Sequence, residues 1–499
     1  EEDNPPLAPV VNALATEWAG TLSSDYTPDA GDLIDLIHRT QRVEMIYAAG
    51  QQHNHALIAD VLGTEEPVWS DIEPLPTDSK PQERLAENLI AAVDLEDDDI
   101  LMVTSVPEGK QVAEKVVETA LERGMEFDVS IRDQELRMKL MNAATPEQVE
   151  AMAEHYWERF EPTTKNIIIN ANENPAIVEQ QDQSKEAMWK KIGQPFNDRR
   201  GDESHERHVQ WTLTYIPTQQ DVDIDGIEYE EYLDLFFEMC DQPWAEIEKA
   251  HKVLCKAFGE GKDVHITNND GTDIRFDIEG HTFAQEPSKI NIPGSEFFSA
   301  PVKDSVNGTI VAKGTFSREG LMEDISLTFE NGRIVKWDAK EGKDTLTRHI
   351  TKGDDVVQDT PEFEGTRYLG ELAFGTNPHL TRHVANPLLV EKIGGSFHVA
   401  LGKAYGDGWG AKIDNGNRAP NGFHWDVTTM LKGKEGEVYL DGHLMQKDGK
   451  WLAVPELGIS EKDVAVLNDG WRAVPEHKRP KYWRDKIAAE DQTQERGAA

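Results

Sequence analysis

The chain has 499 residues, 38% of them hydrophobic, and a formal net charge of −42 at pH 7 from 93 acidic and 51 basic side chains. This length is enough for two or three domains with a large core, and no apolar run approaches the roughly 20 residues of a membrane-spanning helix. The negative charge argues against nucleic acid or an anionic membrane as a partner, because both attract positively charged surfaces.

The acidic composition fits a high-salt, halophilic habitat, in which salt screens the repulsion between carboxylates. It fits an ordinary acidic soluble protein equally well, since lysine is not depleted. We expect a cytoplasmic protein, and the first residues, EEDNPPLAP, also allow a leader that has been removed.

Residues 1–80 are predicted to form an N-terminal extension and the start of an α/β domain, which residues 81–225 continue. In this second segment, buried-strand patterns such as ILMVTSV and NIIIN alternate with helix-periodic stretches. One helix is expected over 109–124, with Leu121 on its apolar stripe, and another begins with a capping box at Thr145. Strands alternating with helices predict a mostly parallel, doubly wound sheet. The first strand-to-helix turn, VPEGKQ, lacks the glycines of a nucleotide-binding loop, which favours a scaffold role.

Residues 226–460 change to a β-rich pattern and are predicted to form a mixed α+β domain. We interpret Asp225 as a helix cap, followed by helices that carry Phe236 to Met239 and Val253 to Phe258 on their apolar faces. Residues 461–499 are expected to form a C-terminal tail that is partly disordered after Trp483. The hairpins of the β-rich domain are expected to turn at pairs that favour positive φ angles: Asp270-Gly271, Asn331-Gly332 and Asp448-Gly449.

Residues of metal-binding type stand in apolar segments of this second domain. Glu371 lies within RYLGELAF, His398 within FHVALG, and both His424 and Asp426 within FHWDV. Residues two apart on a strand point to the same face, so His424 and Asp426 can reach one ion. A buried carboxylate is costly unless a cation or hydrogen bonds compensate its charge, and a divalent metal compensates most strongly. The stretch 365–430 is therefore predicted to carry a metal centre.

Glu296 in NIPGSEFFSAP becomes a further candidate metal ligand because four motifs occur in a fixed order. These are NIPGSEFFSAP, RYLGELAFGTNP, FHVALGKAY and FHWD. Together these motifs resemble the aminopeptidase T and aminopeptidase S family of thermophilic metallo-aminopeptidases, over residues 100–457. The resemblance places the family's metal ligands on Glu296, Glu371, His398, His424 and Asp426, and its active-site tyrosine on Tyr405.

This resemblance implies a Rossmann-like N-terminal domain, a C-terminal domain that binds two divalent ions, and a homodimer whose active sites open into an internal cavity. Carboxylates and imidazoles without thiolates suit Zn, Co, Mn or Mg. The implied activity is hydrolysis of the N-terminal peptide bond of peptides with a free N-terminus, by a hydroxide held between the ions. Glu371 is our candidate for a bridging, catalytic carboxylate, and Tyr405 for a hydrogen-bond donor to the oxyanion. The loop 406–422 departs from the family and bears on substrate range.

Two other function classes stay open. His398, His424 and Asp426 would form the facial triad of a mononuclear non-haem iron ring-cleaving dioxygenase. Glu296 and Glu371 count against it, because an iron triad leaves no use for two further carboxylates. The third class is a catalytically inactive binding homologue that keeps the fold.

His379 and His383 stand four residues apart in HLTRH, a spacing that also occurs in helical zinc sites. They lack the glutamate of the HExxH zinc motif, and prolines bracket the segment. We therefore expect both histidines at the surface or in the wall of a pocket.

Overall fold

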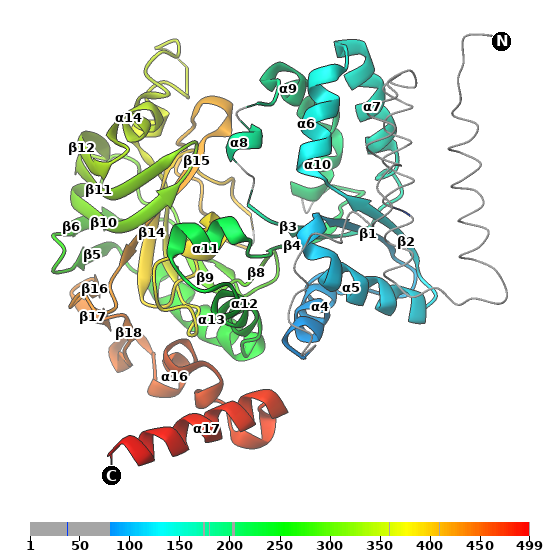
Figure 1. The fold of residues 1–499 in the computed structure, drawn as a ribbon. Coiled ribbons are helices and arrows are strands. Elements are labelled where there is room, and N and C mark those ends of the chain that lie inside the picture. The colour runs from blue at the N-terminus through cyan, green and yellow to red at the C-terminus, as the bar shows by residue number, and fades with distance from the viewer. Residues whose placement is uncertain are drawn as a thin grey trace, which may run out of the picture. The chain divides into compact units, whose positions relative to one another are not determined.

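The computed structural model in Figure 1 describes residues 37, 80–172, 175–178, 180–201, 205–358, 360–408 and 410–498. The predictions for the remainder of residues 1–79 lie outside the described residues. The chain divides into two compact units, Glu1–Gln220 and Asp221–Ala499. Within the described residues, no helix combines the length and the apolar character needed to cross a membrane.

The first unit is built on parallel strands in the spatial order β2-β1-β3-β4. These strands are β1 (Ile100–Ser105), β2 (Glu126–Ile131), β3 (Lys165–Asn170) and β4 (Gln210–Tyr215). The helices are α4 (Lys80–Ala92), α5 (Lys110–Glu122), α6 (Gln134–Ala143), α7 (Pro146–Glu158), α8 (Pro175–Val178), α9 (Gln183–Ile192) and α10 (Gln194–Gly201). In Figure 1, α4 and α5 lie below this sheet and α6, α7 and α10 above it. The predicted parallel α/β sheet is confirmed.

Local sequence signals explain the start of α7 and the buried face of α5, but the prediction for one residue of α5 was wrong. At the start of α7 the Thr145 side chain accepts a hydrogen bond from the Gln148 backbone, and the Gln148 side chain accepts one from the Thr145 backbone, so the predicted capping box is present. On α5 the stripe from Val112 to Ala120 is buried, but Leu121 is 42% exposed. At 100° per residue Leu121 falls roughly 40° beyond Val117, off the edge of the stripe. The prediction that Leu121 is buried was therefore wrong.

The second unit begins within α11 (Gln219–Asp225) and contains two antiparallel sheets with α12 (Tyr229–Cys240) and α13 (Trp244–Glu260). The larger sheet has the order β12-β11-β10-β6-β5-β16-β17-β18. Its strands are β5 (Asp263–Thr267), β6 (Asp273–Asp277), β10 (Asn307–Ser317), β11 (Leu321–Glu330), β12 (Arg333–Glu341), β16 (Glu437–Leu440), β17 (His443–Lys447) and β18 (Lys450–Trp451). Two short helices, α14 (Lys343–Thr351) and α15 (Pro387–Val390), interrupt the strands, and β8 (Asn291–Ile292) precedes the smaller sheet.

The hairpin turns lie where the sequence predicts them, although in the pair Asp270-Gly271 only Gly271 has a positive φ angle, of 108°. Asn331 and Gly332 have φ angles of 49° and 79°, and Asp448 and Gly449 have 47° and 77°. Positive φ at both central residues matches the right-handed twist of the flanking strands. Asp225, in contrast, is the last residue of α11 and caps no helix. Its carboxylate instead accepts hydrogen bonds from the Ala385 backbone and the Tyr232 hydroxyl, which corrects the prediction.

The C-terminal segment is helical rather than partly disordered. It forms α16 (Glu461–Asp469) and α17 (Lys481–Ala498). Trp483 and Ile487 are four residues apart, so they share one face of α17, and both are buried. The Trp483 indole also donates a hydrogen bond to Asp241 at 2.6 Å. These contacts order a segment whose composition suggested a loose tail.

The smaller sheet of the second unit has the order β15-β14-β13-β9-β7. Its strands are β7 (Ala284–Glu286), β9 (Glu296–Ser299), β13 (Leu369–Gly375), β14 (Ser396–Gly402) and β15 (His424–Met430). Every residue of β13 and β14 is buried. On one face, Phe374 packs with Phe297 and with Phe258 of α13, with ring centroids 5.1 and 5.2 Å apart. Because side chains alternate along a strand, Glu371 points to the opposite face from Phe374.

Candidate metal centre

Four adjacent strands of the smaller sheet bring together the residues singled out by the sequence. Glu296 opens β9, Glu371 lies in β13, His398 in β14, and His424 and Asp426 in β15. The pairing places Ala400 opposite both Glu371 and Asp426, so these two carboxylates lie level across β14. One face of the sheet therefore gathers residues that are separated by up to 130 positions in the chain.

The potential ligands fall into two groups that share Glu371. One group is Glu296, Glu371 and His398; the other is Glu371, His424 and Asp426; within each, one ligand atom per residue lies within 4.8 Å of the others. Oε1 of Glu371 is 3.4 Å from Nε2 of His398, and Oε2 is 3.2 Å from Nε2 of His424. The two oxygens of one carboxylate thus serve two different groups.

Burial makes these carboxylates expensive unless a cation compensates them. Glu296 is 6% exposed and Glu371 is 4% exposed. Oε2 of Glu296 and Oδ1 of Asp426 are buried and have no hydrogen-bond partner in the described part of the chain. Buried carboxylate oxygens without partners are rare and call for an explanation, such as an ion. Hard oxygen donors with two imidazoles fit divalent metal ions.

The electrostatics of the cluster also favour added positive charge. Burial alone would lower the pKa of His398, but the neighbouring carboxylates, Glu371 first among them, raise it to about 9. Burial likewise opposes the charged form of His424, and Asp426 outweighs it, so that the pKa of His424 lies well above its usual value. In the absence of other cations, both imidazoles therefore hold protons against the carboxylates. A metal ion would meet the same demand.

The backbone behind His424 fixes the direction of its ring. Its Nδ1 lies 2.7 Å from the Lys403 carbonyl, so Nδ1–H donates and Nε2 faces the cluster. Gly370 explains why this carbonyl can come so close to β13. A Cβ atom at Gly370 would lie 2.5 Å from the Lys403 carbonyl carbon and oxygen, which only glycine avoids.

Two charged residues of the cluster were missed by the sequence reasoning. Lys392 follows α15 and is 0% exposed; its Nζ lies 2.5 Å from Oε1 of Glu296 and 3.2 Å from Oε2 of Glu391. Burial, with the charge of the neighbouring Asp426, raises the pKa of Glu391 to about 8. The signal was a charged pair inside the apolar run PLLVEKIGG.

Tyr405 lies beside the cluster without being enclosed by it. Its ring centroid is 4.7 Å from that of His424 and 6.0 Å from that of Phe298, and the residue is 43% exposed. The loop that follows is fastened to the site strands by Asn417. The Asn417 side-chain amide donates to the carbonyls of Gly402 and Gly365 at 2.5 and 2.9 Å.

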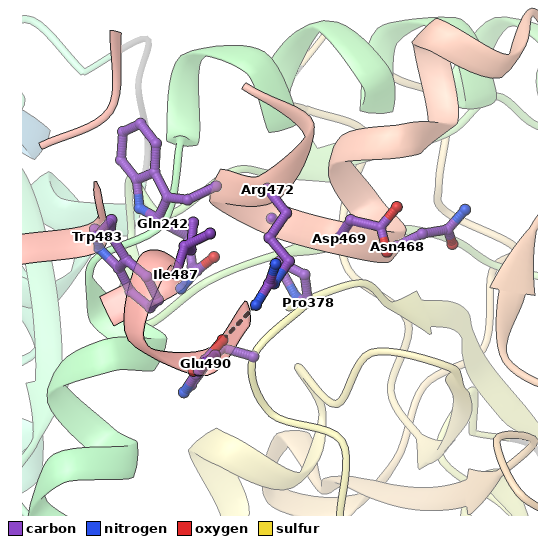
Figure 2. A pocket seen from close by; sticks show the side chains of 11 residues that line it. Gln242, Pro378, Asn468, Asp469, Arg472, Trp483, Ile487 and Glu490 are labelled. Atoms are coloured by element: carbon purple, nitrogen blue, oxygen red, sulfur yellow. Dashed lines mark hydrogen bonds and ion pairs between the residues drawn. The ribbon is translucent and has the colours of Figure 1, made fainter. Parts of the chain in front are cut away.

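His379 and His383 lie apart from the cluster. His379 lines a cavity of about 210 Å³ near the C-terminal helices, whose wall includes Trp483 and Arg472 (Figure 2). Its Nε2 is 2.5 Å from a carboxylate oxygen of Glu238. His383 packs against the Phe316 ring, with centroids 5.1 Å apart. His379 thus stands in the wall of a pocket, as the sequence suggested.

Comparison with known proteins identifies the family of the chain. Residues 79–451 match the family model described as thermophilic metalloprotease (M29). The chain is 35% identical to aminopeptidase AmpS of Bacillus subtilis (strain 168) over 131 residues, 25% of this chain and 28% of that protein. It is 34% identical to aminopeptidase 2 of Geobacillus stearothermophilus over 120 residues, 23% of this chain and 26% of that protein. The match thus spans about a quarter of the length of these curated relatives.

Two solved structures align with this chain, and the first of them is similar in fold. Wild-type AmpT from Thermus thermophilus aligns with a TM-score of 0.58 and 21% identity, covering 75% of this chain and all of that chain. The 2,5-dihydroxypyridine dioxygenase from Pseudomonas putida KT2440 aligns with a TM-score of 0.46 and 12% identity, over 77% of this chain and all of that chain. Since the family model extends over most of the sequence, from residue 79 to residue 451, the chain belongs to the M29 family of thermophilic metalloproteases.

Proposed function

We propose that this protein is a metal-dependent aminopeptidase, which removes the N-terminal residue from peptides. The observation that carries the proposal is the pair of ligand groups that share Glu371, in a chain of a metalloprotease family. A shared carboxylate between two groups is the arrangement expected of a two-metal hydrolytic site.

In this proposal one divalent ion, Zn, Co, Mn or Mg, is held by Glu296, Glu371 and His398, and a second by Glu371, His424 and Asp426. Oε2 of Glu296 and Oδ1 of Asp426, which accept no hydrogen bond in the described part of the chain, support this assignment, because each oxygen has lone pairs available to bind an ion. Two such ions, when bound, supply a hydroxide nucleophile near neutral pH and polarise the carbonyl group that it attacks.

The protein's own groups would orient the substrate. The Tyr405 ring packs against His424, and the residue is partly exposed to solvent. Its hydroxyl can therefore donate a hydrogen bond to the carbonyl of a peptide bound at the cluster. This bond would strengthen as the carbonyl oxygen becomes an oxyanion, which lowers the barrier rather than merely binding substrate. The Lys403 carbonyl keeps the His424 ring in place during this change.

The substrate class follows from the charge of the site. A cluster with the carboxylates of Glu296, Glu371 and Asp426 favours a positively charged group, such as the free α-ammonium group of a peptide. We therefore propose peptides with a free N-terminus as substrates. A homodimer and a high-salt habitat, both expected from the sequence, remain proposals of the same kind.

The iron-dioxygenase alternative has weaker support from the geometry. It requires His398, His424 and Asp426 around one ion. Among the described residues, two groups have ligand atoms that all lie within 4.8 Å of one another. His398 belongs to one group and His424 to the other, and Glu371 belongs to both. Two sets around one glutamate favour two ions over one.

The test is hydrolysis of a short peptide in two forms, one with a free N-terminus and one N-acetylated, each with and without a chelator. We expect release of the N-terminal residue from the free form only, and loss of that activity with chelator. Equal cleavage of both forms would contradict the aminopeptidase assignment, because an exopeptidase must recognise the amine. Oxygen consumption with an aromatic substrate would instead support the dioxygenase.

A further inference from the structure

Lys392 distinguishes the two ligand groups. Its ammonium group is buried, and its shortest contact, 2.5 Å, is with Oε1 of Glu296. Glu296 belongs only to the group with Glu371 and His398, called here site 1. Site 2 is the group of Glu371, His424 and Asp426; no lysine or arginine within 4.0 Å of its carboxylates is found among the described residues.

The position of Lys392 is fixed by its backbone as well as by its charge. Its N–H donates to the Leu389 carbonyl at 3.0 Å, and its carbonyl accepts from Asn377, just beyond β13, at 2.9 Å. Oε2 of Glu391 contacts the ammonium group from a second side, at 3.2 Å. The burial and these two carboxyl contacts hold the ammonium group beside Glu296.

This contact limits what Glu296 can give to a metal. With Oε1 committed to Lys392, the oxygen that faces His398 is Oε2, 3.4 Å from Nε2, and it has no hydrogen-bond partner in the described part of the chain. Glu296 can therefore offer one oxygen, and its charge is already partly neutralised. The Lys392 ammonium group, on the other side of the Glu296 carboxylate, would also repel an ion in site 1. Buried surroundings screen this repulsion only weakly.

We propose that Lys392 makes the two metal sites unequal, so that site 2 fills first and tightly and site 1 fills second and more weakly. This inference rests on the proposed two-metal function and adds an order of occupancy to it. A weaker site 1 gives the enzyme a metal-poor, inactive form with one ion bound. The activity would then increase with the concentration of free metal ion, as site 1 becomes occupied.

The test is titration of the metal-free, full-length protein with Mn²⁺, followed by calorimetry and by electron paramagnetic resonance of free and bound Mn²⁺. The wild type should bind two ions in steps whose dissociation constants differ by about tenfold or more. K392M should tighten the second step by about tenfold and leave the first nearly unchanged. K392R, which keeps the charge, should retain the difference between the two dissociation constants. K336M, at an exposed lysine of β12, should behave as the wild type.

Several outcomes would overturn the inference. Two wild-type constants within about threefold of each other would contradict it while leaving the two-metal function intact. Equal weakening of both steps in K392M would show that Lys392 supports only the fold. K392Q, which keeps a hydrogen-bond donor, repeats the test if K392M does not fold. Binding of one ion or none by the wild type would overturn the proposed function as well.

Discussion

Oε1 of Glu371 lies 3.4 Å from Nε2 of His398, between the neighbouring strands β13 and β14. The second oxygen of the same carboxylate is 3.2 Å from His424 of β15. Glu371 is thus the only residue common to both ligand groups found in the described chain. Its removal should affect both sites at once.

E371Q is therefore expected to lose both ions rather than one. The amide keeps the size of the side chain but not its charge, so two ions would lose their shared anionic ligand. Metal content should fall from two ions per chain to below one, and peptide hydrolysis by about a hundredfold or more. E330Q, at an exposed glutamate of β11, should change neither value. Retention of both ions by E371Q would exclude a bridging role.

Y405F tests the proposed oxyanion contact. The ring and its packing on His424 stay in place, so metal content and stability should match the wild type. Loss of one hydrogen bond to the developing oxyanion should lower kcat by about 10²-fold, with little change in KM. Y439F, which removes a hydroxyl bonded to Glu437 on β16, is the matched control. An unchanged kcat in Y405F would assign Tyr405 to packing alone.

Glu238 should stabilise the docking of the C-terminal helices in a pH-dependent way. Burial would raise the pKa of Glu238, but hydrogen bonds from His379, Lys486 and Tyr482 outweigh it and hold the pKa at about 2, below the ordinary value of 4.5. A carboxyl whose pKa is lowered on folding stabilises the fold above its unfolded pKa, and this contribution is lost as the pH falls through the folded pKa.

E238Q should therefore lower the free energy of unfolding by roughly 2 kcal/mol at pH 7. The difference from the wild type should shrink as the pH falls from 4.5 toward 2, where Glu238 itself becomes protonated. Urea unfolding at several pH values measures it. E246Q, at a half-exposed surface ion pair with Lys249, should cost less than about 1 kcal/mol. A pH-independent difference would contradict the account.

Asn417 should hold the loop between Tyr405 and His424 against the site strands. The side chain is fully buried, and its amide donates to the carbonyls of Gly365 and Gly402. N417A leaves these buried carbonyls without that donor, which should cost about 2–3 kcal/mol in urea unfolding. Faster proteolysis within residues 406–422 should accompany the loss. A cost below about 0.5 kcal/mol would mean that the loop is held by other contacts.

The sequence predicted those parts of the fold that depend on local patterns. Buried runs such as NIIIN, capping residues such as Thr145 and turn pairs such as Asn331-Gly332 act within a few residues, so their outcome can be read directly. Glu371 and the FHWDV pair could be noticed because polar residues interrupt apolar strands. His398 was noticed in the same way within FHVALG, and the resemblance to a known family then linked these residues to Glu296.

The rest depends on contacts between distant segments. Lys392 reaches Glu296 across 96 positions of the chain, and no local pattern shows that a lysine is buried against a distant glutamate. Asp225 resembles a helix cap by its neighbours, yet its partner is the Ala385 backbone, 160 positions away. The order of α17 likewise comes from Glu238 and Asp241, far from it in sequence.

The central claim is that five side chains hold two ions around Glu371. The most direct measurement is a crystal structure of the full chain soaked with Mn²⁺, with anomalous scattering recorded to locate the metal. The account predicts two anomalous peaks separated by about 3.5–4 Å, one on each side of the Glu371 carboxylate. A single peak bound by His398, His424 and Asp426, or none near Glu371, would contradict it.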